Sequence, residues 1–143
     1  MNGSVDVFAR TLLIDAGPFV AAIDRTDRRH DWAKRTLPKV RGRVVTCEAC
    51  VTEALHLVEN SPAAIDALRR LLAQIEVVPV LAGELESVFQ LLSDFAPGMD
   101  LADGCLVALQ RRIPRSIVVT TDHRDFCAYR IPFLSPQGLF AAK

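Results

Sequence analysis

Short apolar runs alternate with helix-like periodicities along the chain. Leu12, Leu13 and Ile14 are followed at once by Gly17 and Pro18, so the run is too short for a helix and predicts a buried strand over residues 11–15. Similar runs predict strands over 43–46, 75–80 and 116–120, and a last short strand over 130–134. Pro79 lacks an amide hydrogen, which places the strand over 75–80 near the edge of a sheet.

Helices are predicted between these strands by apolar positions that recur every three or four residues. They cover residues 18–23, 30–37, about 62–73, 82–95 and 100–112, with another after residue 46. Ser61 followed by Pro62 is a helix start signal, and Thr46 is predicted to cap the helix that contains Glu48. Strands separated by helices predict an α/β fold with a parallel sheet covered on both faces.

The 143 residues suit one domain, predicted over 11–143, after a flexible leader over 1–10. The 17 basic and 17 acidic residues balance, so overall charge gives no indication of a nucleic-acid partner. No stretch resembles a membrane span or a signal peptide, which predicts a cytoplasmic protein with reduced cysteines. Cys47 and Cys50 have the spacing of a redox motif, but a role as small buried apolar residues is the favoured interpretation.

Four acidic residues are the candidate functional residues of the chain. Asp15 and Asp122 each follow a predicted strand, and Glu53 and Asp103 lie on predicted helices. The carboxyl ends of parallel strands are where open α/β sheets bind ligands, and carboxylates are preferred ligands of Mg²⁺ and Mn²⁺. Each acid also has a structural interpretation, as a helix cap for Asp15 and Asp122 or as a solvated surface residue for Glu53 and Asp103.

Four segments that contain these acids resemble the motifs of PIN-domain proteins. The first is the run from Leu13 to Ala21 around Asp15, and the second combines Thr46–Ala49 with Glu53–Leu55. The third runs from Met99 through Asp103 to Leu109, and the fourth from Thr120 to Phe126. The motifs occur in family order and at family spacing, and they span residues 12 to about 132. Gly104 and Cys105 depart from the Ala-Ser of many relatives, and glycine inside a helix costs about 1 kcal/mol relative to alanine.

The resemblance implies a three-layer α/β/α sandwich and Mg²⁺- or Mn²⁺-dependent cleavage of RNA. It implies the toxin half of a VapC-type toxin–antitoxin pair, inhibited by an antitoxin protein that places an Arg or Lys among the acids. By position it implies a site of Asp15, Glu53, Asp103 and Asp122, with Thr121 as a supporting hydroxyl and Asp100 and Asp125 as possible additional members. Asp15 and Asp103 are the expected direct metal ligands. A homodimer is also expected, and an inactive PIN-like module that binds RNA or protein is the alternative.

Other functions fit the sequence less well. A phosphoacceptor receiver domain needs a Lys after a late strand, and Lys39 and Lys143 lie outside any such place. An aspartyl phosphatase needs an acid two residues after the first, where this chain has Gly17. Arg25, Arg28 and Arg29 form a loop that could meet phosphates, although a solvated loop is favoured. His30 is expected to be a surface residue rather than a general base.

Overall fold

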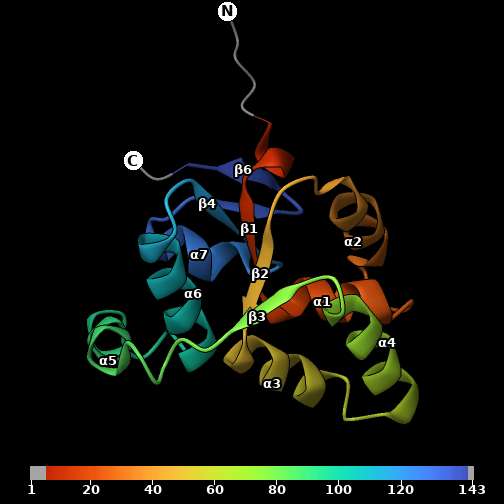
Figure 1. Ribbon diagram of the computed structural model, residues 1–143, viewed down its shortest axis with the longest axis horizontal. Helices are drawn as coiled ribbons and strands as arrows, with labels where there is room; N and C mark the ends of the chain where they lie inside the picture. Colours follow the sequence, from red (N-terminus) through yellow and green to blue (C-terminus); the bar gives the residue numbers. More distant parts are fainter. Residues whose placement is uncertain (1–5, 142–143) are drawn as a thin grey trace, which may run out of the picture.

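A six-stranded sheet forms the centre of the computed structural model, which describes residues 6–141 (Figure 1). The strands are β1 (Thr11–Ile14), β2 (Val44–Cys47), β3 (Glu76–Val78), β4 (Ser116–Val119), β5 (Phe133–Ser135) and β6 (Gly138–Phe140). Their spatial order is β3-β2-β1-β4-β5-β6. The first five are parallel to their neighbours, and β6 pairs antiparallel with β5. The predicted α/β fold with a parallel central sheet is therefore confirmed.

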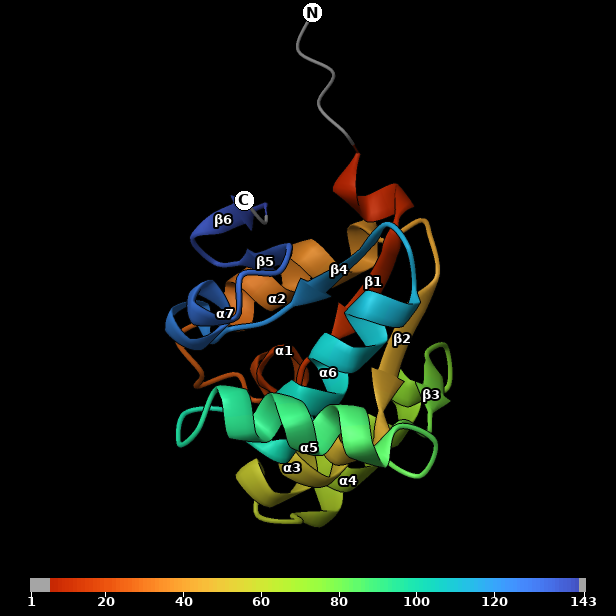
Figure 2. The same cartoon turned by 90° about the vertical axis from the view of Figure 1, so that its left-hand side faces the viewer.

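Helices cover both faces of this sheet and complete three layers (Figures 1 and 2). One layer contains α5 (Leu85–Asp94), α6 (Leu101–Arg112) and α7 (His123–Tyr129). The opposite layer contains α1 (Ala16–Ile23), α2 (His30–Thr36) and α4 (Pro62–Leu72). Helix α3 (Glu48–Leu57) lies at the end of the sheet where β1 and β2 finish. Two short 3₁₀ helices, Val7–Ala9 and Leu37–Lys39, complete the secondary structure.

Alternating side chains of the strands build two cores, because successive residues of a strand point to opposite faces. Leu13 packs with the α6 residues Leu106 and Leu109 in one core. Leu12 and Ile14 belong to the other core, on the side of α1 and α4. Strand β1 is thus covered on both sides, and all three of its apolar side chains have zero exposure. This burial holds the end of β1 in a fixed place, where Asp15 follows.

Several predicted boundaries differ from the observed ones for identifiable reasons. The prediction that Thr46 caps α3 is wrong, because its hydroxyl donates to the carbonyl of Ile14 at 2.7 Å and ties β2 to β1. Cys47 occupies the cap position without a side-chain hydrogen bond. Helix α5 begins at Leu85 rather than at residue 82, since amides of the preceding turn bond to the carbonyl of Val80. Strand β6 was not predicted, and β3 lies at the sheet edge as Pro79 indicated.

Part of the predicted leader is anchored to the domain. Residues 1–5 lie outside the described residues, whereas Val7–Ala9 form a 3₁₀ helix capped by Asp6. The carbonyl of Phe8 accepts hydrogen bonds from the amides of Arg41 and Gly42. Within residues 6–141, no helix has the length and apolar character that crossing a membrane requires.

Candidate active site

Two neighbouring strands carry acidic residues to the same edge of the sheet. Asp15 directly follows β1, and Asp122 follows β4 after two threonines. Strands β1 and β4 are parallel and paired from Thr11–Ser116 to Ile14–Val119, so their carboxyl ends lie side by side. Both acids also cap the helix that comes next, Asp15 through the amide of Ala16 and Asp122 through that of Asp125. The capping interpretation is therefore correct and leaves each carboxylate at the sheet edge.

Asp15 is the most tightly held of the acids. Its side chain is only 6% exposed, and each oxygen has a donor. The amide of Ala16 donates to Oδ1 at 2.8 Å, and the hydroxyl of Thr120 donates to Oδ2 at 2.7 Å. The same Thr120 hydroxyl accepts a hydrogen bond from the amide of Asp122 at 2.9 Å. One buried threonine therefore fixes Asp15 and the start of the Asp122 loop together.

Helix α6 supplies the second buried acid. Asp103 is 6% exposed in the first turn, where its amide donates to the capping carboxylate of Asp100 at 2.8 Å. The hydroxyl of Tyr129, from the end of α7, donates to Oδ2 of Asp103 at 2.7 Å. Asp103 is thereby oriented by α7, the helix that follows Asp122. Asp100 is exposed and caps the turn of α6 that contains Asp103.

The acids influence one another electrostatically. Burial, with smaller contributions from Glu53 and Asp100, raises the pKa of Asp15 to about 7. Burial and the charges of Asp100, Asp103 and Asp122 raise the pKa of Glu53 to about 7. The pKa of Asp103 rises to about 8 through burial and then through Asp15, Asp100 and Asp122. These groups come from α3, α6 and the loops that follow β1 and β4, so the fold has brought the charges of the four predicted acids close enough to influence one another.

The two additional acids take different positions. Asp100 contributes to the raised pKa values of Asp15, Glu53 and Asp103, which places it at the rim of the same cluster. The pKa of Asp125 is raised mainly by its contact with the Asp122 side chain. Asp125 therefore lies beside Asp122 at the outer side of the site.

The expected supporting hydroxyl, Thr121, does not bond to Asp15 among the described contacts; Thr120 does. Thr121 lies instead against the first turn of α1, where a Cβ on Gly17 would come 1.9 Å from its Oγ1. The sequence Thr120-Thr121-Asp122 does not indicate which of the two threonine hydroxyls would bond to Asp15. In the structure Thr120 is fully buried at the end of β4, whereas Thr121 is partly exposed.

Sequence reasoning also missed Tyr129 and Cys50. Tyr129 is the only tyrosine of the chain, a polar tip on the otherwise apolar end of α7, and this is the signal that could have drawn attention to it. The thiol of Cys50 lies 4.0 Å from Oδ1 of Asp15. The spacing of Cys47 and Cys50 is visible in the sequence. The contact of Cys50 with Asp15 depends on how α3 packs against the end of β1.

The donor chemistry of the cluster fits a hard divalent cation. Its oxygen-bearing side chains are carboxylates, which Mg²⁺ and Mn²⁺ prefer, and their raised pKa values are those of anions that lack a countercharge. Within residues 6–141, no three acidic, histidine or cysteine side chains lie together in a group that could hold a metal ion. The cluster therefore offers ligands of the preferred type but no preformed metal site, and water or substrate oxygens would have to complete the coordination.

The sequence motifs and the fold now have a common explanation. The family model of the PIN domain matches residues 12–132, a range that holds all four acids and runs from the second residue of β1 to the residue before β5. The chain belongs to the PIN domain family. No curated protein sequence gives a significant match.

Solved PIN-domain structures share the fold at low sequence identity. VapC20 of Mycobacterium tuberculosis, described as a Sarcin-Ricin loop cleaving toxin, has a TM-score of 0.72 and 22% identity, covering 82% of this chain and 94% of its own. A chain of VapBC2 from Rickettsia felis, bound to a fragment of promoter DNA, has a TM-score of 0.60 and 15% identity, covering 82% and 92%. A toxin–antitoxin complex from Klebsiella pneumoniae has a TM-score of 0.60 and 16% identity, covering 80% and 89%.

Proposed function

We propose that this PIN-domain protein is a metal-dependent endoribonuclease and the toxin of a type II toxin–antitoxin pair. The observation that carries the proposal is the cluster of Asp15, Glu53, Asp103 and Asp122, whose members come from four segments and whose charges help to raise the pKa values of Asp15, Glu53 and Asp103. Burying several carboxylates together without a cationic partner is costly, and helix capping alone would not require it. The described ion pairs instead involve other acids, such as Glu76 with Arg43.

The protein's own residues would prepare the site for RNA hydrolysis. Asp15 and Asp103, fixed by Thr120 and Tyr129, would hold Mg²⁺ or Mn²⁺. Such an ion, when bound, polarises a phosphoryl oxygen and lowers the pKa of a coordinated water. Glu53 and Asp122 are less rigidly held, and each would orient water at the rim of the cluster. Asp100 and Asp125 would extend the negative surface around these groups.

The decisive experiment is cleavage of RNA by the purified protein with Mg²⁺ or Mn²⁺. We expect Asp15→Asn to lower the cleavage rate by about 100-fold or more, which corresponds to about 3 kcal/mol at the transition state. Asp31→Asn, an exposed acid on α2, is the matched control and should keep full activity. Circular dichroism of both variants checks that the fold is retained.

Removal of the metal gives the second arm of this test. Chelator should abolish cleavage, and added Mn²⁺ should restore it. Cleavage that persists in excess chelator, or in Asp15→Asn, would refute the mechanism. A folded protein that binds RNA and never cleaves it would favour the alternative of an inactive binding module.

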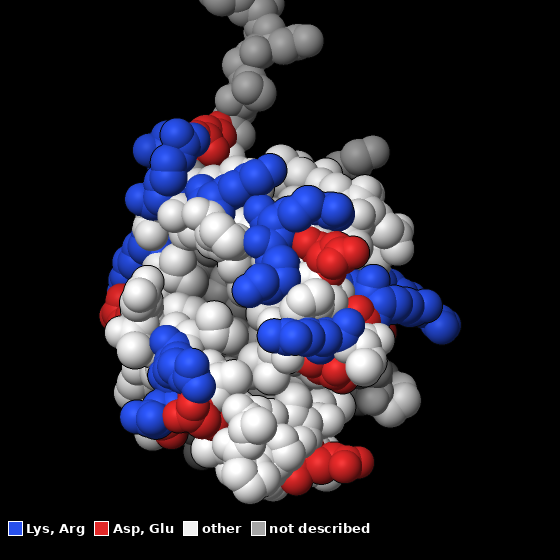
Figure 3. All heavy atoms as spheres, turned by 90° about the vertical axis from the view of Figure 1, so that its right-hand side faces the viewer, with Lys and Arg blue, Asp and Glu red and all other residues white. Residues whose placement is uncertain are grey.

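A groove in the helix layer of α1, α2 and α4 supports the proposal that an antitoxin binds this protein. A groove of about 700 Å³ between α1, α2 and α4 has Ile23, Leu37 and Leu71 among its apolar lining, with Arg25 and Lys34 at its margin. Figure 3 shows this side of the molecule, where basic side chains border uncharged surface. An amphipathic segment with acidic residues would match it, and a coexpressed antitoxin should protect Lys34 from acetylation. The expected homodimer would use other exposed apolar residues, such as Phe89 of α5.

A further inference from the structure

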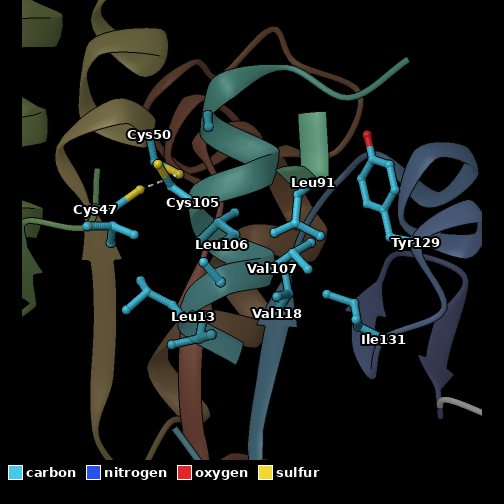
Figure 4. Packing of buried hydrophobic residues seen from close by; sticks show 14 of the residues in the cluster. Leu13, Cys47, Cys50, Leu91, Cys105, Leu106, Val107, Val118, Tyr129 and Ile131 are labelled. Atoms are coloured by element: carbon cyan, nitrogen blue, oxygen red, sulfur yellow. Dashed lines mark hydrogen bonds between the residues drawn. The ribbon is translucent and has the colours of Figure 1, made fainter. Parts of the chain in front are cut away.

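Three thiols meet beside the acidic cluster. Cys47 ends β2, Cys50 lies in the first turn of α3, and Cys105 comes from α6. Figure 4 shows their sulfur atoms directed toward one another, and all three are buried free cysteines. The Sγ atoms of Cys47 and Cys50 lie 3.5 Å apart. We propose that Cys47 and Cys50 are a redox-active pair that peroxide converts reversibly to a disulfide, and that the disulfide weakens metal binding at the acidic site.

The position of the pair on α3 favours disulfide formation. Cys47 is the N-cap residue and Cys50 lies three residues further on, so the two side chains face each other across the first helical turn. Their sulfur atoms must approach from 3.5 Å to about 2.05 Å, which needs side-chain rotation and a small shift of the turn. Interactions with the Cys105 and Cys50 thiols also lower the pKa of Cys47, the thiol that would react first.

A cavity gives small oxidants a route to the pair. It has a volume of about 480 Å³ and is lined by Cys47 and Cys105 together with Val80, Leu81, Leu85 and Leu101. Leu85 and Leu101 are 48% and 39% exposed, so the cavity borders solvent. Its mostly apolar lining admits a small neutral molecule such as hydrogen peroxide more readily than a charged oxidant.

The oxidation balances with peroxide as the oxidant. The sulfur of Cys47 attacks one peroxide oxygen, the O–O bond breaks, and a sulfenic acid and water are formed. The thiol of Cys50 then attacks the sulfenic sulfur, which releases a second water and forms the S–S bond. The two sulfur atoms together lose two electrons, and the peroxide oxygen atoms end as water. A dithiol reductant reverses the change by thiol–disulfide exchange.

One contact and one helical spacing connect the pair to the acids, and this part rests on the proposed metal site. The thiol of Cys50 donates to Oδ1 of Asp15 at 4.0 Å. A disulfide at Cys50 would remove this hydrogen bond and draw the sulfur atom toward Cys47. Glu53 follows Cys50 by three residues on the same helix face. A shift of the first turn of α3 therefore moves Glu53 relative to Asp103.

Disulfide mapping of the wild-type protein tests the pair itself. Native protein is treated with hydrogen peroxide, quenched with catalase, denatured and alkylated, and its peptides are identified by mass spectrometry. We expect a Cys47–Cys50 disulfide that dithiothreitol reverses, while Cys105 remains a free thiol. The proposal would be overturned if Cys47 and Cys50 were both alkylated without prior reduction, or if Cys47 were joined to Cys105. Cys127, an exposed thiol on α7, reports that the oxidant was active.

Mn²⁺ titration by calorimetry tests the coupling to the acids. The oxidised protein should bind Mn²⁺ about tenfold more weakly than the reduced protein, which is the usual cost of disturbing groups next to metal ligands. Cys47→Ala and, separately, Cys105→Ala are the matched variants. The first should make Mn²⁺ affinity insensitive to peroxide, and the second should leave the tenfold change in place. Equal affinities of the oxidised and reduced wild-type protein would refute the coupling, whether or not the protein cleaves RNA.

Discussion

At the scale of single residues, Thr120 connects the two strand-end acids. Its hydroxyl donates to Oδ2 of Asp15 and accepts from the amide of Asp122, and it has no exposed surface. Replacing this hydroxyl with a methyl group would leave a buried carboxylate oxygen and a backbone amide without partners. Buried polar groups that lose their partners cost about 1–3 kcal/mol each.

The first prediction compares the two adjacent threonines. Thr120→Val should lower the free energy of unfolding by about 2 kcal/mol and weaken Mn²⁺ binding about tenfold, because Asp15 loses its donor. Thr121→Val is the matched control and should change the free energy of unfolding much less, since its hydroxyl makes no described bond to an acid. Urea unfolding and Mn²⁺ calorimetry measure the two quantities. A larger loss in Thr121→Val would return the supporting role to Thr121.

At the scale of elements, two glycines set how closely the helices approach. Gly17 in the first turn of α1 faces the end of β4, where an added Cβ would lie 1.9 Å from Thr121 Oγ1. Gly104 in α6 faces α5, where an added Cβ would lie 3.4 Å from Val88 and 3.5 Å from Leu92. A methyl group at position 17 would therefore clash with Thr121, whereas a methyl group at position 104 would make ordinary van der Waals contacts with α5.

Gly17→Ala should therefore destabilise the protein. We expect the free energy of unfolding to fall by about 1–3 kcal/mol, because Thr121 or the start of α1 must move. Gly83→Ala is the control, since its Cβ would meet no atom within 4 Å. Thermal unfolding of the two variants should separate them clearly, and equal melting temperatures would show that the contact relaxes without cost.

Gly104→Ala should have the opposite effect. Alanine is favoured over glycine inside a helix, and its methyl group fits against α5, so we expect a gain of about 0.5–1 kcal/mol in the free energy of unfolding. Mn²⁺ affinity should not decrease, because Asp103 keeps its hydrogen bond from Tyr129. A loss of stability would indicate that α5 cannot accommodate the extra methyl group.

At the scale of the whole molecule, folding concentrates negative charge that the unfolded chain keeps apart. The pKa values of Asp15 and Asp103 rise from 3.8 to about 7 and about 8, and that of Glu53 rises from 4.5 to about 7. An acid whose pKa is higher in the folded state stabilises the fold only while it is protonated. Its contribution is complete below about pH 4 and is lost as the pH rises through 7–8.

The metal-free protein should consequently become less stable as the pH increases from 5 to 8.5. Asp103→Asn removes one of the repelling charges, so in chelator at pH 8.5 it should be about 2 kcal/mol more stable than the wild type. The difference should shrink toward pH 5, where Asp103 is protonated in the folded wild type. Melting temperatures across this pH range provide the measurement, and a variant that is less stable at pH 8.5 would contradict the charge argument.

Much of the fold could be predicted from local pattern. The strand at Leu12–Ile14 and the cap at Ser61 are both encoded in a few neighbouring residues, and the structure confirms the elements they predict. Strand β6 was missed because its three residues carry no distinctive alternation and gain their order from pairing with β5. Thr46 was misjudged because its hydroxyl has a partner on another strand.

The sequence by itself determined the four acids, their order along the chain and the α/β fold, because motif spacing and hydrophobic periodicity are local properties. Tertiary structure decided which hydroxyl holds Asp15, how Tyr129 reaches Asp103 and why three cysteines meet beside the acids. These contacts join residues as far apart as Asp15 and Thr120, which only the parallel pairing of β1 and β4 brings together. The raised pKa values have the same origin, since burial and charge repulsion arise only when the separate segments pack around one end of the sheet.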